Sequence, residues 1–370
     1  MMARLGDLYQ ITSGGTPSRK QLDYYQDGTI PWVKTGDLKE KYLRATDEKI
    51  TEIGLKNSSA RIYPKDTVLI AMYGATIGAS SILKIEAATN QACAAFVKRD
   101  DVIPEYLYAF LESQQSRFIK DAVGGAQPNI SAGYLKQIDM PLIPIEEQRR
   151  IAALLDRVSD LIAKRRAQLD KLDELVKARF VEMFGEPVSN PKHWEKEVFS
   201  KNVTLLNGRA FKQEELLDFG KYPVLRVGNF FSNRGWYYSD LELDDDKYCD
   251  NGDLLYAWSA SFGARIWEGD KVIYHYHIWK VLIKDAYDKQ FLCKLLDYVT
   301  QSLMADTHGI AMMHLTKNGM EKTPFIVPPL ELQEKFSSFV QQIDKSKLTI
   351  QQSLDKLEVL KKALMQQYFG

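Results

Sequence analysis

An internal repeat is the feature that most constrains what this chain can fold into. Pro144-Ile145-Glu146-Glu147-Gln148 recurs as Pro329-Leu330-Glu331-Leu332-Gln333, and Leu169-Asp170-Lys171-Leu172 recurs as Leu354-Asp355-Lys356-Leu357. The dipeptide Phe-Gly ends both copies. Each match lies 185 positions after its first copy, which is half of the 370 residues. A period that holds over several segments predicts one architecture used twice.

Each copy predicts one long helix. A proline followed by acidic residues is typical of a helix start, because the first turn does not use the missing donor and carboxylates favour the positive end of the helix dipole. Neither copy contains a further proline or a glycine before its terminal Phe-Gly. Apolar residues recur every seven positions, which places them in the narrow stripe of a coiled-coil seam. The two columns are Leu155, Ile162, Leu169, Val176 and Met183, and Phe336, Ile343, Ile350, Leu357 and Leu364.

Two seams in one chain most simply pack against each other as an intramolecular antiparallel pair. The alternatives are a coiled coil between chains and packing of the helices into a larger core. A helix of this length measures roughly 57 Å at about 1.5 Å per residue, which is longer than a small domain is wide. We therefore expect two long antiparallel coiled-coil helices, at residues 144–185 and 329–370, that join globular domains at residues 1–143 and 186–328.

The two globular segments share an order of motifs. In the first, Asp66 to Met72 predicts a buried strand that leads into Gly74-Ala75-Thr76-Ile77-Gly78. In the second, Gly252 to Gly263 has the same pattern. Strands and helices do not alternate regularly in either segment, which favours an α+β fold over a parallel doubly wound sheet. Because the glycine frame repeats while the side chains between differ, we expect two pseudo-symmetric α+β domains with different surfaces.

Composition narrows the class of protein. No run approaches the ~18 apolar residues of a membrane span, and the first residues lack the hydrophobic core of a signal peptide. The three scattered cysteines disfavour disulfides and a zinc cluster, and they fit a reducing cytoplasm. The formal net charge of zero argues modestly against a surface that binds a polyanion everywhere, although acidic residues elsewhere can offset a basic face.

Taken together, the motifs resemble those of the specificity (S) subunit of type I restriction-modification enzymes. The resemblance covers nearly the whole chain and rests on the order and duplication of motifs that are weak individually. The motifs are Gly15-Thr16-Pro17-Ser18, Ile30-Pro31-Trp32, Gly74-Ala75-Thr76-Ile77-Gly78, Asn90-Gln91 and the two Pro-(Ile/Leu)-Glu-X-Gln helix starts at Pro144 and Pro329. The second half departs from this pattern, because Arg209-Ala210-Phe211-Lys212 replaces Gly-Thr-Pro and Tyr274-His275-Tyr276-His277 replaces Asn90-Gln91.

The resemblance implies a non-catalytic subunit that reads DNA. Each of two target recognition domains would read one half of a bipartite site in duplex DNA, with the two helices between them. The resemblance also implies docking of two adenine-methylating modification subunits and of ATP-driven restriction subunits. The chain itself would then hold no cofactor, while S-adenosylmethionine, ATP and Mg²⁺ belong to the partner subunits. The expected location is the cytoplasm, without a membrane partner.

DNA recognition needs cations for phosphates, and amide, hydroxyl or guanidinium groups for base edges. Side chains of these kinds on predicted loops and strand ends are our candidates for DNA contact. The first domain supplies Arg19, Lys20, Lys34, Thr76, Asn90, Gln91, Gln127 and Asn129, and the second supplies Arg209, Lys212, Arg226, Asn229, Ser259, Ser261, His275 and His314. For each of them the alternative is a solvated or turn-stabilising residue.

Other chemistry finds little support in the sequence. The segment from Gly14 to Lys20 lacks the spacing of a phosphate-binding loop, and we find no adenine-pocket or methyl-donor motif. His275 and His277 alternate on a predicted strand, but without an evident third ligand they favour packing or nucleic-acid contact over a metal. For Trp236-Tyr237-Tyr238 and Trp258, a core or interface role is favoured over base stacking.

Three other functions stay open at this stage. A joint specificity subunit of a related type II restriction system would have the same duplicated design. A coiled-coil scaffold with two protein-binding modules is slightly favoured by the neutral net charge. An enzyme that acts alone is the least favoured, because its motifs are missing.

If the chain reads a bipartite DNA site, as the resemblance implies, the role of the helices in spacing the two half-sites can be tested. We expect four residues inserted after both Ala167 and Gln352 to lengthen the helices by about 6 Å and to rotate one end by roughly 40°. A DNA base pair rises about 3.4 Å and turns about 34°, so the spacer between half-sites should grow by one or two base pairs. Some affinity should be lost, because four residues interrupt the seven-residue seam. A folded, active variant that keeps the old spacer would show that the helices do not set this distance.

Overall fold

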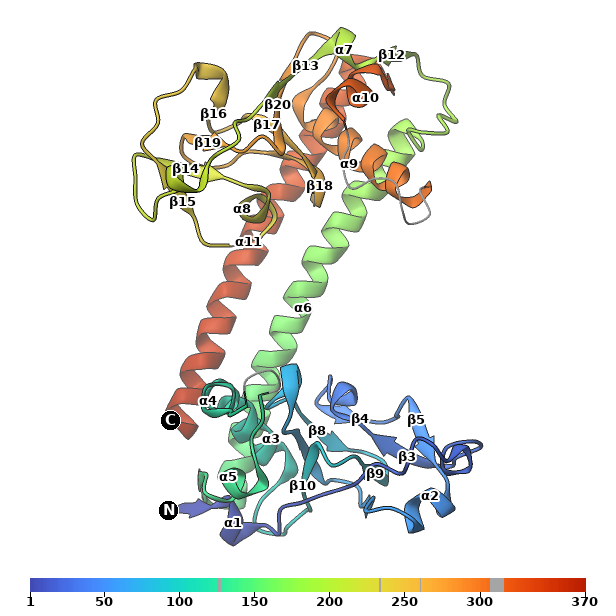
Figure 1. The fold of residues 1–370 in the computed structure, drawn as a ribbon, viewed down its shortest axis with the longest axis vertical. Coiled ribbons are helices and arrows are strands. Elements are labelled where there is room, and N and C mark those ends of the chain that lie inside the picture. The colour runs from blue at the N-terminus through green and yellow to red at the C-terminus, as the bar shows by residue number, and fades with distance from the viewer. Residues whose placement is uncertain (125–127, 233, 260, 307–315) are drawn as a thin grey trace. The chain divides into compact units, whose positions relative to one another are not determined.

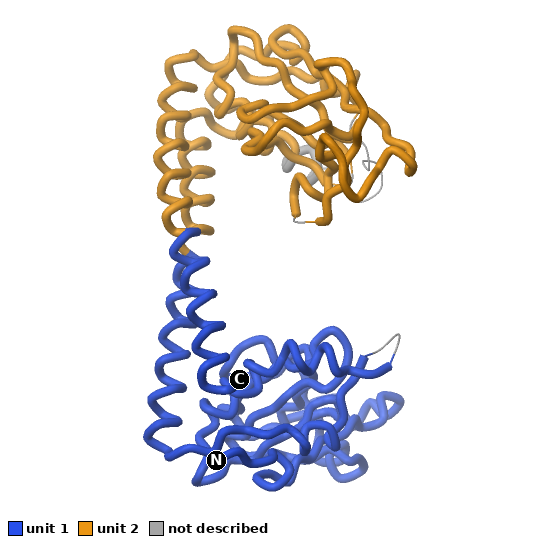
Figure 2. The backbone as a smooth tube through the Cα atoms, turned by 90° about the vertical axis from the view of Figure 1, so that its left-hand side faces the viewer, with its two compact units in different colours: residues 1–167, 351–370 blue, residues 168–350 orange. Residues whose placement is uncertain are grey.

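The computed structural model describes residues 1–124, 128–232, 234–259, 261–306 and 316–370 (Figure 1). By its internal contacts the chain divides into two compact units (Figure 2). Unit 1 comprises Met1–Ala167 and Gln351–Gly370, and unit 2 comprises Gln168–Ile350. Unit 1 is therefore built from two segments that are distant in the sequence, whereas unit 2 is one continuous segment.

Both repeats form the long helices that the sequence predicts. Helix α6 covers Ile145–Phe184 and helix α11 covers Leu330–Phe369, with 40 residues each. The boundary between the units falls inside both helices, so each unit contains part of α6 and part of α11. The helices therefore contribute to two separate cores.

The helix pairing is antiparallel, as expected from the two seams. In unit 1 the start of α6 packs with the end of α11, because Ile151 and Leu155 share a hydrophobic cluster with Phe369. In unit 2 the end of α6 packs with the start of α11, where Val176 and Phe336 share a cluster. These apolar residues of both helices are thus buried within one chain, without a coiled coil between chains.

Ion pairs flank the seam in each unit. Arg166 of α6 donates to Glu358 of α11 at 2.7 Å in unit 1, and Lys347 donates to Asp173 at 2.6 Å in unit 2. These side chains are roughly one third to two thirds exposed, and ion pairs in contact with solvent contribute little to stability, about 0–1 kcal/mol each. The apolar seam is therefore the main source of helix pairing.

Unit 1 is an α+β domain with short helices around its sheets. The sheet orders are β1-β11, β2-β10-β7-β8-β4 and β5-β3-β9-β6. The strands are β1 (Met2–Arg4), β2 (Thr12–Ser13), β3 (Ile30–Val33), β4 (Tyr42–Leu43), β5 (Glu48–Ile50), β6 (Ile62–Tyr63), β7 (Val68–Ala71), β8 (Ser80–Leu83), β9 (Ala87–Thr89), β10 (Cys93–Phe96) and β11 (Asp139–Pro141). The helices before α6 are α1 (Leu5–Leu8), α2 (Glu52–Lys56), α3 (Pro104–Ser113), α4 (Gln115–Asp121) and α5 (Ala132–Lys136), with 3-10 turns η1 (Leu22–Tyr24), η2 (Thr35–Asp37) and η3 (Gly74–Thr76).

Unit 2 repeats this plan. The sheet orders are β12-β21, β13-β20-β17-β18 and β15-β14-β19-β16. The strands are β12 (Lys196–Val198), β13 (Val203–Asn207), β14 (Tyr222–Leu225), β15 (Tyr237–Ser239), β16 (Tyr248–Cys249), β17 (Leu254–Ser259), β18 (Ser261–Ile266), β19 (Val272–Tyr274), β20 (Ile278–Ile283) and β21 (Pro324–Ile326). The helices before α11 are α7 (Phe199–Asn202), α8 (Val227–Phe231), α9 (Lys289–Asp306) and α10 (Lys317–Lys322), with 3-10 turns η4 (Gln213–Glu215) and η5 (Asp245–Lys247).

The two units differ in detail where their sequences differ. The helical segment of unit 1 that begins at Pro104 divides into α3 and α4 at Gln114, whereas its counterpart α9 in unit 2 is continuous. Strands β17 and β18 form a longer hairpin than β7 and β8, with Ser259 opposite Ser261 at its tip. The α+β fold with a common frame is confirmed within each unit.

A buried glutamine at the start of each long helix ties that helix to its unit. In α6, the Gln148 side chain accepts from the Ile103 N–H at 3.0 Å and donates to the Asp101 and Ile143 carbonyls at 2.8 Å. In α11, Gln333 accepts from the Asp288 N–H at 2.9 Å and donates to two carbonyls, those of Ala286 and Pro328. This explains the repeated glutamine of the Pro-(Ile/Leu)-Glu-X-Gln motif as a structural residue.

We expect Gln333→Leu to destabilise the chain by about 2–4 kcal/mol, because leucine leaves buried backbone groups without partners. Gln341→Leu is the matched control, since Gln341 is exposed on the same helix. Urea denaturation of both variants gives the comparison. Equal midpoints for the two variants would contradict the role assigned to Gln333.

Candidate nucleic-acid interface

In unit 1, candidate residues meet where two parallel strands end side by side. Strands β3 and β9 pair in parallel with Val33 opposite Thr89, and the next residues are Lys34 and Asn90. The Asn90 N–H donates to the Val33 carbonyl at 3.0 Å. A third segment joins them, because the Gly15 N–H donates to the Thr89 carbonyl at 2.9 Å. The three segments together form the first candidate site.

The same backbone arrangement recurs in unit 2. Strands β14 and β19 pair in parallel with Leu225 opposite Tyr274, and Arg226 and His275 follow them. The His275 N–H donates to the Leu225 carbonyl at 2.9 Å, and the Arg209 N–H donates to the Tyr274 carbonyl at 3.0 Å. Arg226 is thus equivalent to Lys34, His275 to Asn90, and Arg209 to Gly15.

The close approach of the third segment requires glycine in both units. A Cβ at Gly14 would lie 1.9 Å from the Thr89 carbonyl oxygen, and one at Gly208 would lie 2.3 Å from the Tyr274 carbonyl oxygen. Carbon and oxygen atoms cannot approach so closely, so a side chain would push the segment away from the strand. This is the physical reason that a glycine stands at both places.

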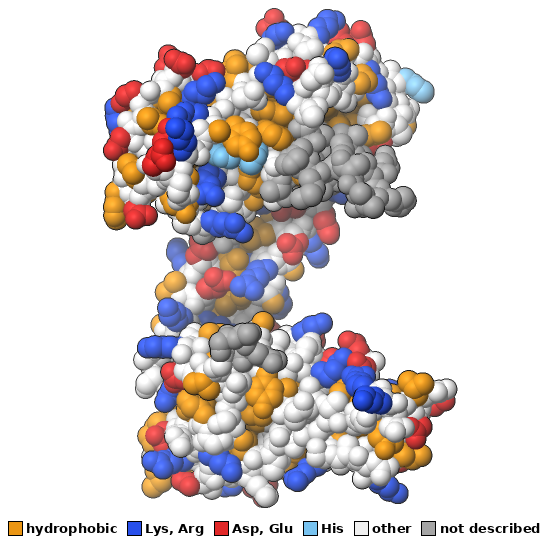
Figure 3. All heavy atoms as spheres, viewed as in Figure 1, with side chains coloured by type: hydrophobic (Ala, Val, Ile, Leu, Met, Phe, Trp, Pro, Cys, Tyr) orange, Lys and Arg blue, Asp and Glu red, His pale blue; other side chains and the backbone are white. Residues whose placement is uncertain are grey.

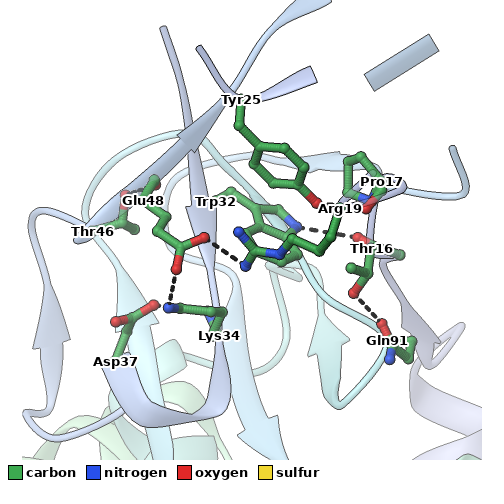
Figure 4. Close-up of polar contacts among 11 residues, drawn as sticks. Thr16, Pro17, Arg19, Tyr25, Trp32, Lys34, Asp37, Thr46, Glu48 and Gln91 are labelled. Carbon is green, nitrogen blue, oxygen red and sulfur yellow. Dashed lines mark hydrogen bonds and ion pairs between the residues drawn. The ribbon is translucent and has the colours of Figure 1, made fainter. Parts of the chain in front are cut away.

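A cluster of two cations and one carboxylate lies at the site of unit 1 (Figure 4). The Glu48 carboxylate accepts from Arg19 at 2.6 Å and from Lys34 at 2.5 Å. The hydrogen bond from Lys34 lowers the pKa of Glu48, burial opposes this effect, and the hydrogen bond from Arg19 lowers it further. Arg19 and Lys34 are half-exposed, so solvent reaches all three groups.

Aromatic rings hold the Arg19 side chain from a second direction. Its guanidinium carbon lies 4.4 Å from the ring centre of Tyr25 and 5.1 Å from that of Trp32 (Figure 4). Both rings are fixed by the glycine-rich segment, since Tyr25 donates to the Pro17 carbonyl and the Trp32 indole donates to the Gly15 carbonyl. The Gly-Thr-Pro segment therefore organises the groups around Arg19.

The amide candidates of unit 1 have different surroundings. Gln91 is exposed, and its side-chain oxygen accepts from the Thr16 hydroxyl at 2.5 Å. Asn90 is half-buried, and its side-chain oxygen accepts from the Ala92 N–H at 3.1 Å. Lys20 is exposed beside Arg19 in the sequence. The structure brings Arg19, Lys34 and Gln91 to one site.

In unit 2 an arginine is held at the same site by a different carboxylate. Both terminal nitrogens of Arg209 donate to Glu215, at 2.8 and 2.7 Å, and this paired geometry fixes the guanidinium plane. The Lys212 N–H also donates to Glu215. The hydrogen bonds from Arg209 and then from the Lys212 backbone lower the pKa of Glu215 to about 2. The Lys212 side chain is itself exposed.

Imidazole and aromatic rings occupy the place of Asn90 and Gln91. Tyr276 and His277 form the turn between β19 and β20, and His275 pairs with Arg209 through an isolated bridge, so the prediction of one strand across both histidines was wrong. The rings of Tyr276 and His277 lie 3.9 Å apart, and Trp258 packs beside His277 at 5.2 Å. On the visible face of unit 2, histidine atoms lie beside hydrophobic ones (Figure 3). The turn therefore presents rings where unit 1 presents amides.

The strand-end cation of unit 2 rests on an aromatic ring. The Arg226 guanidinium lies 4.9 Å from the ring centre of Tyr237 on β15. Tyr237, predicted as a core or interface residue, is half-buried against the cluster of Val224, Tyr248 and Ile273 and also contacts this candidate cation. Sequence reasoning also missed Glu48 and Glu215, because a glutamate at a strand or turn position carries no local signal.

The remaining candidates lie elsewhere in their units or have local partners. The Thr76 hydroxyl donates to the Tyr73 carbonyl, and the Asn129 backbone pairs with Val123 beside that turn. The Asn229 amide donates to the Arg234 and Gly235 carbonyls, which makes it turn-stabilising. Ser259 is 3% exposed, whereas Ser261 is exposed. Gln127 and His314 lie outside the described residues.

Among the described side chains, no group of three His, Cys, Asp or Glu residues is placed to bind a metal ion. Within the same part of the chain, no helix combines the length and apolar character that crossing a membrane requires. Cys93, Cys249 and Cys293 are buried free thiols, and burial raises the pKa of each to about 12.

Comparison with known proteins gives a consistent result. A family model described as the type I restriction modification DNA specificity domain matches residues 1–172 and 191–361. The type I restriction enzyme MjaIX specificity subunit of Methanocaldococcus jannaschii is 26% identical, over 98% of this chain and 90% of that protein.

Two solved structures share the fold over the full length. One is the S subunit of a type I restriction-modification system from M. genitalium, with a TM-score of 0.56 at 16% identity, covering 100% of this chain and 96% of that chain. The other comes from work on complex assembly and conformational transition of the type I system, with a TM-score of 0.64 at 17% identity and coverages of 100% and 97%.

The surroundings of His275 lower the pKa of its imidazole, which has a testable effect on stability. Burial lowers its pKa to about 4, and His277 and Arg226 act in the same direction. Since an unfolded histidine titrates at about 6.5, the folded state binds fewer protons between these pH values and loses stability as the pH falls from 6.5 towards 4.

We expect NMR titration to show a neutral His275 ring between pH 6 and 8. We also expect His275→Asn, which introduces the residue of the equivalent position in unit 1, to weaken the loss of stability between pH 7 and 5. An imidazole that titrates near pH 6.5 would contradict this environment.

Proposed function

The chain belongs to the type I restriction modification DNA specificity family, and from that membership we propose that it is the DNA sequence-specificity subunit of a type I restriction-modification complex. In this proposal residues 1–143 and 186–328 are two target recognition domains that read the halves of a bipartite duplex site. The chain also docks two adenine methyltransferase subunits and the restriction subunits.

One observation carries the proposal. The same backbone site, at the ends of two parallel strands, is built in both units from different side chains. Lys34 and Asn90 in unit 1 become Arg226 and His275 in unit 2. Cations suit phosphate oxygens, and amide, imidazole and guanidinium groups suit base edges. A DNA site with two unlike halves requires two recognition domains that share a backbone frame and carry different side chains.

The chemistry of modification and cleavage belongs to other subunits. The relative from M. jannaschii is named a specificity subunit, and members of this kind are non-catalytic. S-adenosylmethionine, ATP and Mg²⁺ are therefore assigned to the partner subunits. In this chain the candidate residues position DNA rather than transform it.

A scaffold that binds no DNA is the principal rival from another class. The net charge of zero favours it, and basic and acidic side chains are intermingled on the visible face of both units (Figure 3). Family membership favours DNA binding, because the matching family is defined by DNA specificity. Duplex binding with a steep dependence on salt, measured in the presence of the methyltransferase subunits, separates the two.

The proposal is tested by exchanging one of the two recognition domains. We expect replacement of residues 1–143 by the equivalent segment of another family member to change one half of the methylated site, because each unit carries its own candidate contacts. Single-molecule sequencing of methylated adenines in the host gives the site before and after the exchange. Replacement of residues 186–328 is the matched control and should change the other half.

Two results would count against the proposal. If one replacement changed both half-sites, the units would not be independent readers. If the unaltered complex bound no duplex DNA and methylated no bipartite site, the chain would not be a specificity subunit. A type II system with a joint specificity subunit would instead appear through its partner subunits on co-purification.

A further inference from the structure

The cation at the strand end has a different partner in each unit. In unit 1, Glu48 of β5 lies opposite Trp32 of β3, two residues before Lys34. In unit 2, Tyr237 of β15 lies opposite Val224 of β14, two residues before Arg226. The two registers make Glu48 and Tyr237 structurally equivalent. A carboxylate thus holds Lys34 where an aromatic ring holds Arg226.

Glu48 binds two candidate cations at once. Its two carboxylate oxygens accept separately, one from Arg19 and the other from Lys34. These bonds fix the directions of two long, half-exposed side chains, of which Arg19 is also held by aromatic rings. The low pKa of Glu48 keeps the carboxylate charged at neutral pH. One negative charge therefore restrains two positive charges.

This restraint has a predictable effect on DNA binding. Contacts between cations and phosphates give affinity for any sequence, and each releases counterions. A carboxylate beside the cations repels phosphate and competes for the same donors. A cation held by an uncharged ring remains available to phosphate. Glu215 restrains Arg209 in unit 2 as Glu48 restrains Arg19 in unit 1, so the expected difference lies at the strand-end cations. Arg226 should therefore allow more sequence-independent binding than Lys34 does.

We propose that Glu48 is a specificity-determining positioning residue, which orients Arg19 and Lys34 and limits their contacts with phosphates of non-cognate DNA. Tyr237 orients Arg226 without such a limit. The inference rests on the proposed function, because it assigns a role within the first reader. It goes beyond that function by explaining how a cationic site discriminates between sequences.

Glu48→Gln tests the proposal in the full chain with its methyltransferase subunits. Glu86→Gln is the control, because it removes the same charge from an exposed position in the turn before β9. Affinity is measured over a salt series for the cognate duplex and for duplexes mismatched in the first or the second half-site. Thermal unfolding verifies that each variant is folded.

We expect Glu48→Gln to steepen the slope of log affinity against log salt concentration by about one to two units. Up to two cations become free to bind phosphate, and each phosphate contact adds roughly 0.9 to this slope. Preference for the cognate over the first-half mismatch should fall about tenfold at low salt. Preference for the cognate duplex over the duplex mismatched in the second half-site should stay constant. Arg19→Gln combined with Lys34→Gln should abolish the effect of Glu48→Gln on the salt dependence.

The reciprocal variant covers the case in which Glu48→Gln does not fold. Tyr237→Glu places a carboxylate beside Arg226, so the salt dependence should become shallower and the second half-site more strictly read. The inference is overturned if folded Glu48→Gln shows the same salt dependence of DNA affinity as Glu86→Gln. It is also overturned if Tyr237→Glu leaves the salt dependence of the unaltered chain unchanged. If the unaltered complex binds no duplex, the proposed function itself fails.

Discussion

Neither unit can complete its core without both long helices, and this constraint governs the structure. Phe369, next to the end of the chain, lies 5.3 Å from the Tyr106 ring and 5.7 Å from the Phe110 ring in unit 1. Its repeat counterpart Phe184 lies 4.7 Å from the Phe291 ring in unit 2. Fully burying such a side chain contributes about 1.5–3 kcal/mol. Each helix is therefore part of two cores, and the repeat must be preserved as a whole.

The rigid frame leaves the reading surface free to vary. Backbone hydrogen bonds, a close-approach glycine and a pair of parallel strands define the site in both units. None of these elements depends on the identity of the side chains that follow the strands. Amides in one unit and rings in the other can occupy the same place without a change of fold. This separation of frame and surface fits the proposed role, in which two domains share a frame and recognise different half-sites.

At both candidate sites, carboxylates accompany the positively charged side chains, so neither site is a purely basic patch. Glu48 restrains Arg19 and Lys34, and Glu215 restrains Arg209. The neutral net charge of the chain is consistent with this arrangement, because cations at the sites are accompanied by carboxylates. Affinity for DNA can then depend on orientation and exchange of partners as well as on total charge. A neutral composition is thus a weak argument against DNA binding.

The sequence by itself determined the duplication, the two long helices and the α+β class, because a fixed repeat and a seven-residue apolar period are local patterns that survive folding. It also located Arg19, Lys34 and Arg209 on loops and strand ends. Only the tertiary structure paired Lys34 with Glu48 and Arg226 with Tyr237, since strand register decides which residues face each other. It also paired His275 with Arg209, placed His277 in a turn and buried Ser259, because these outcomes depend on contacts between segments that lie far apart in the chain.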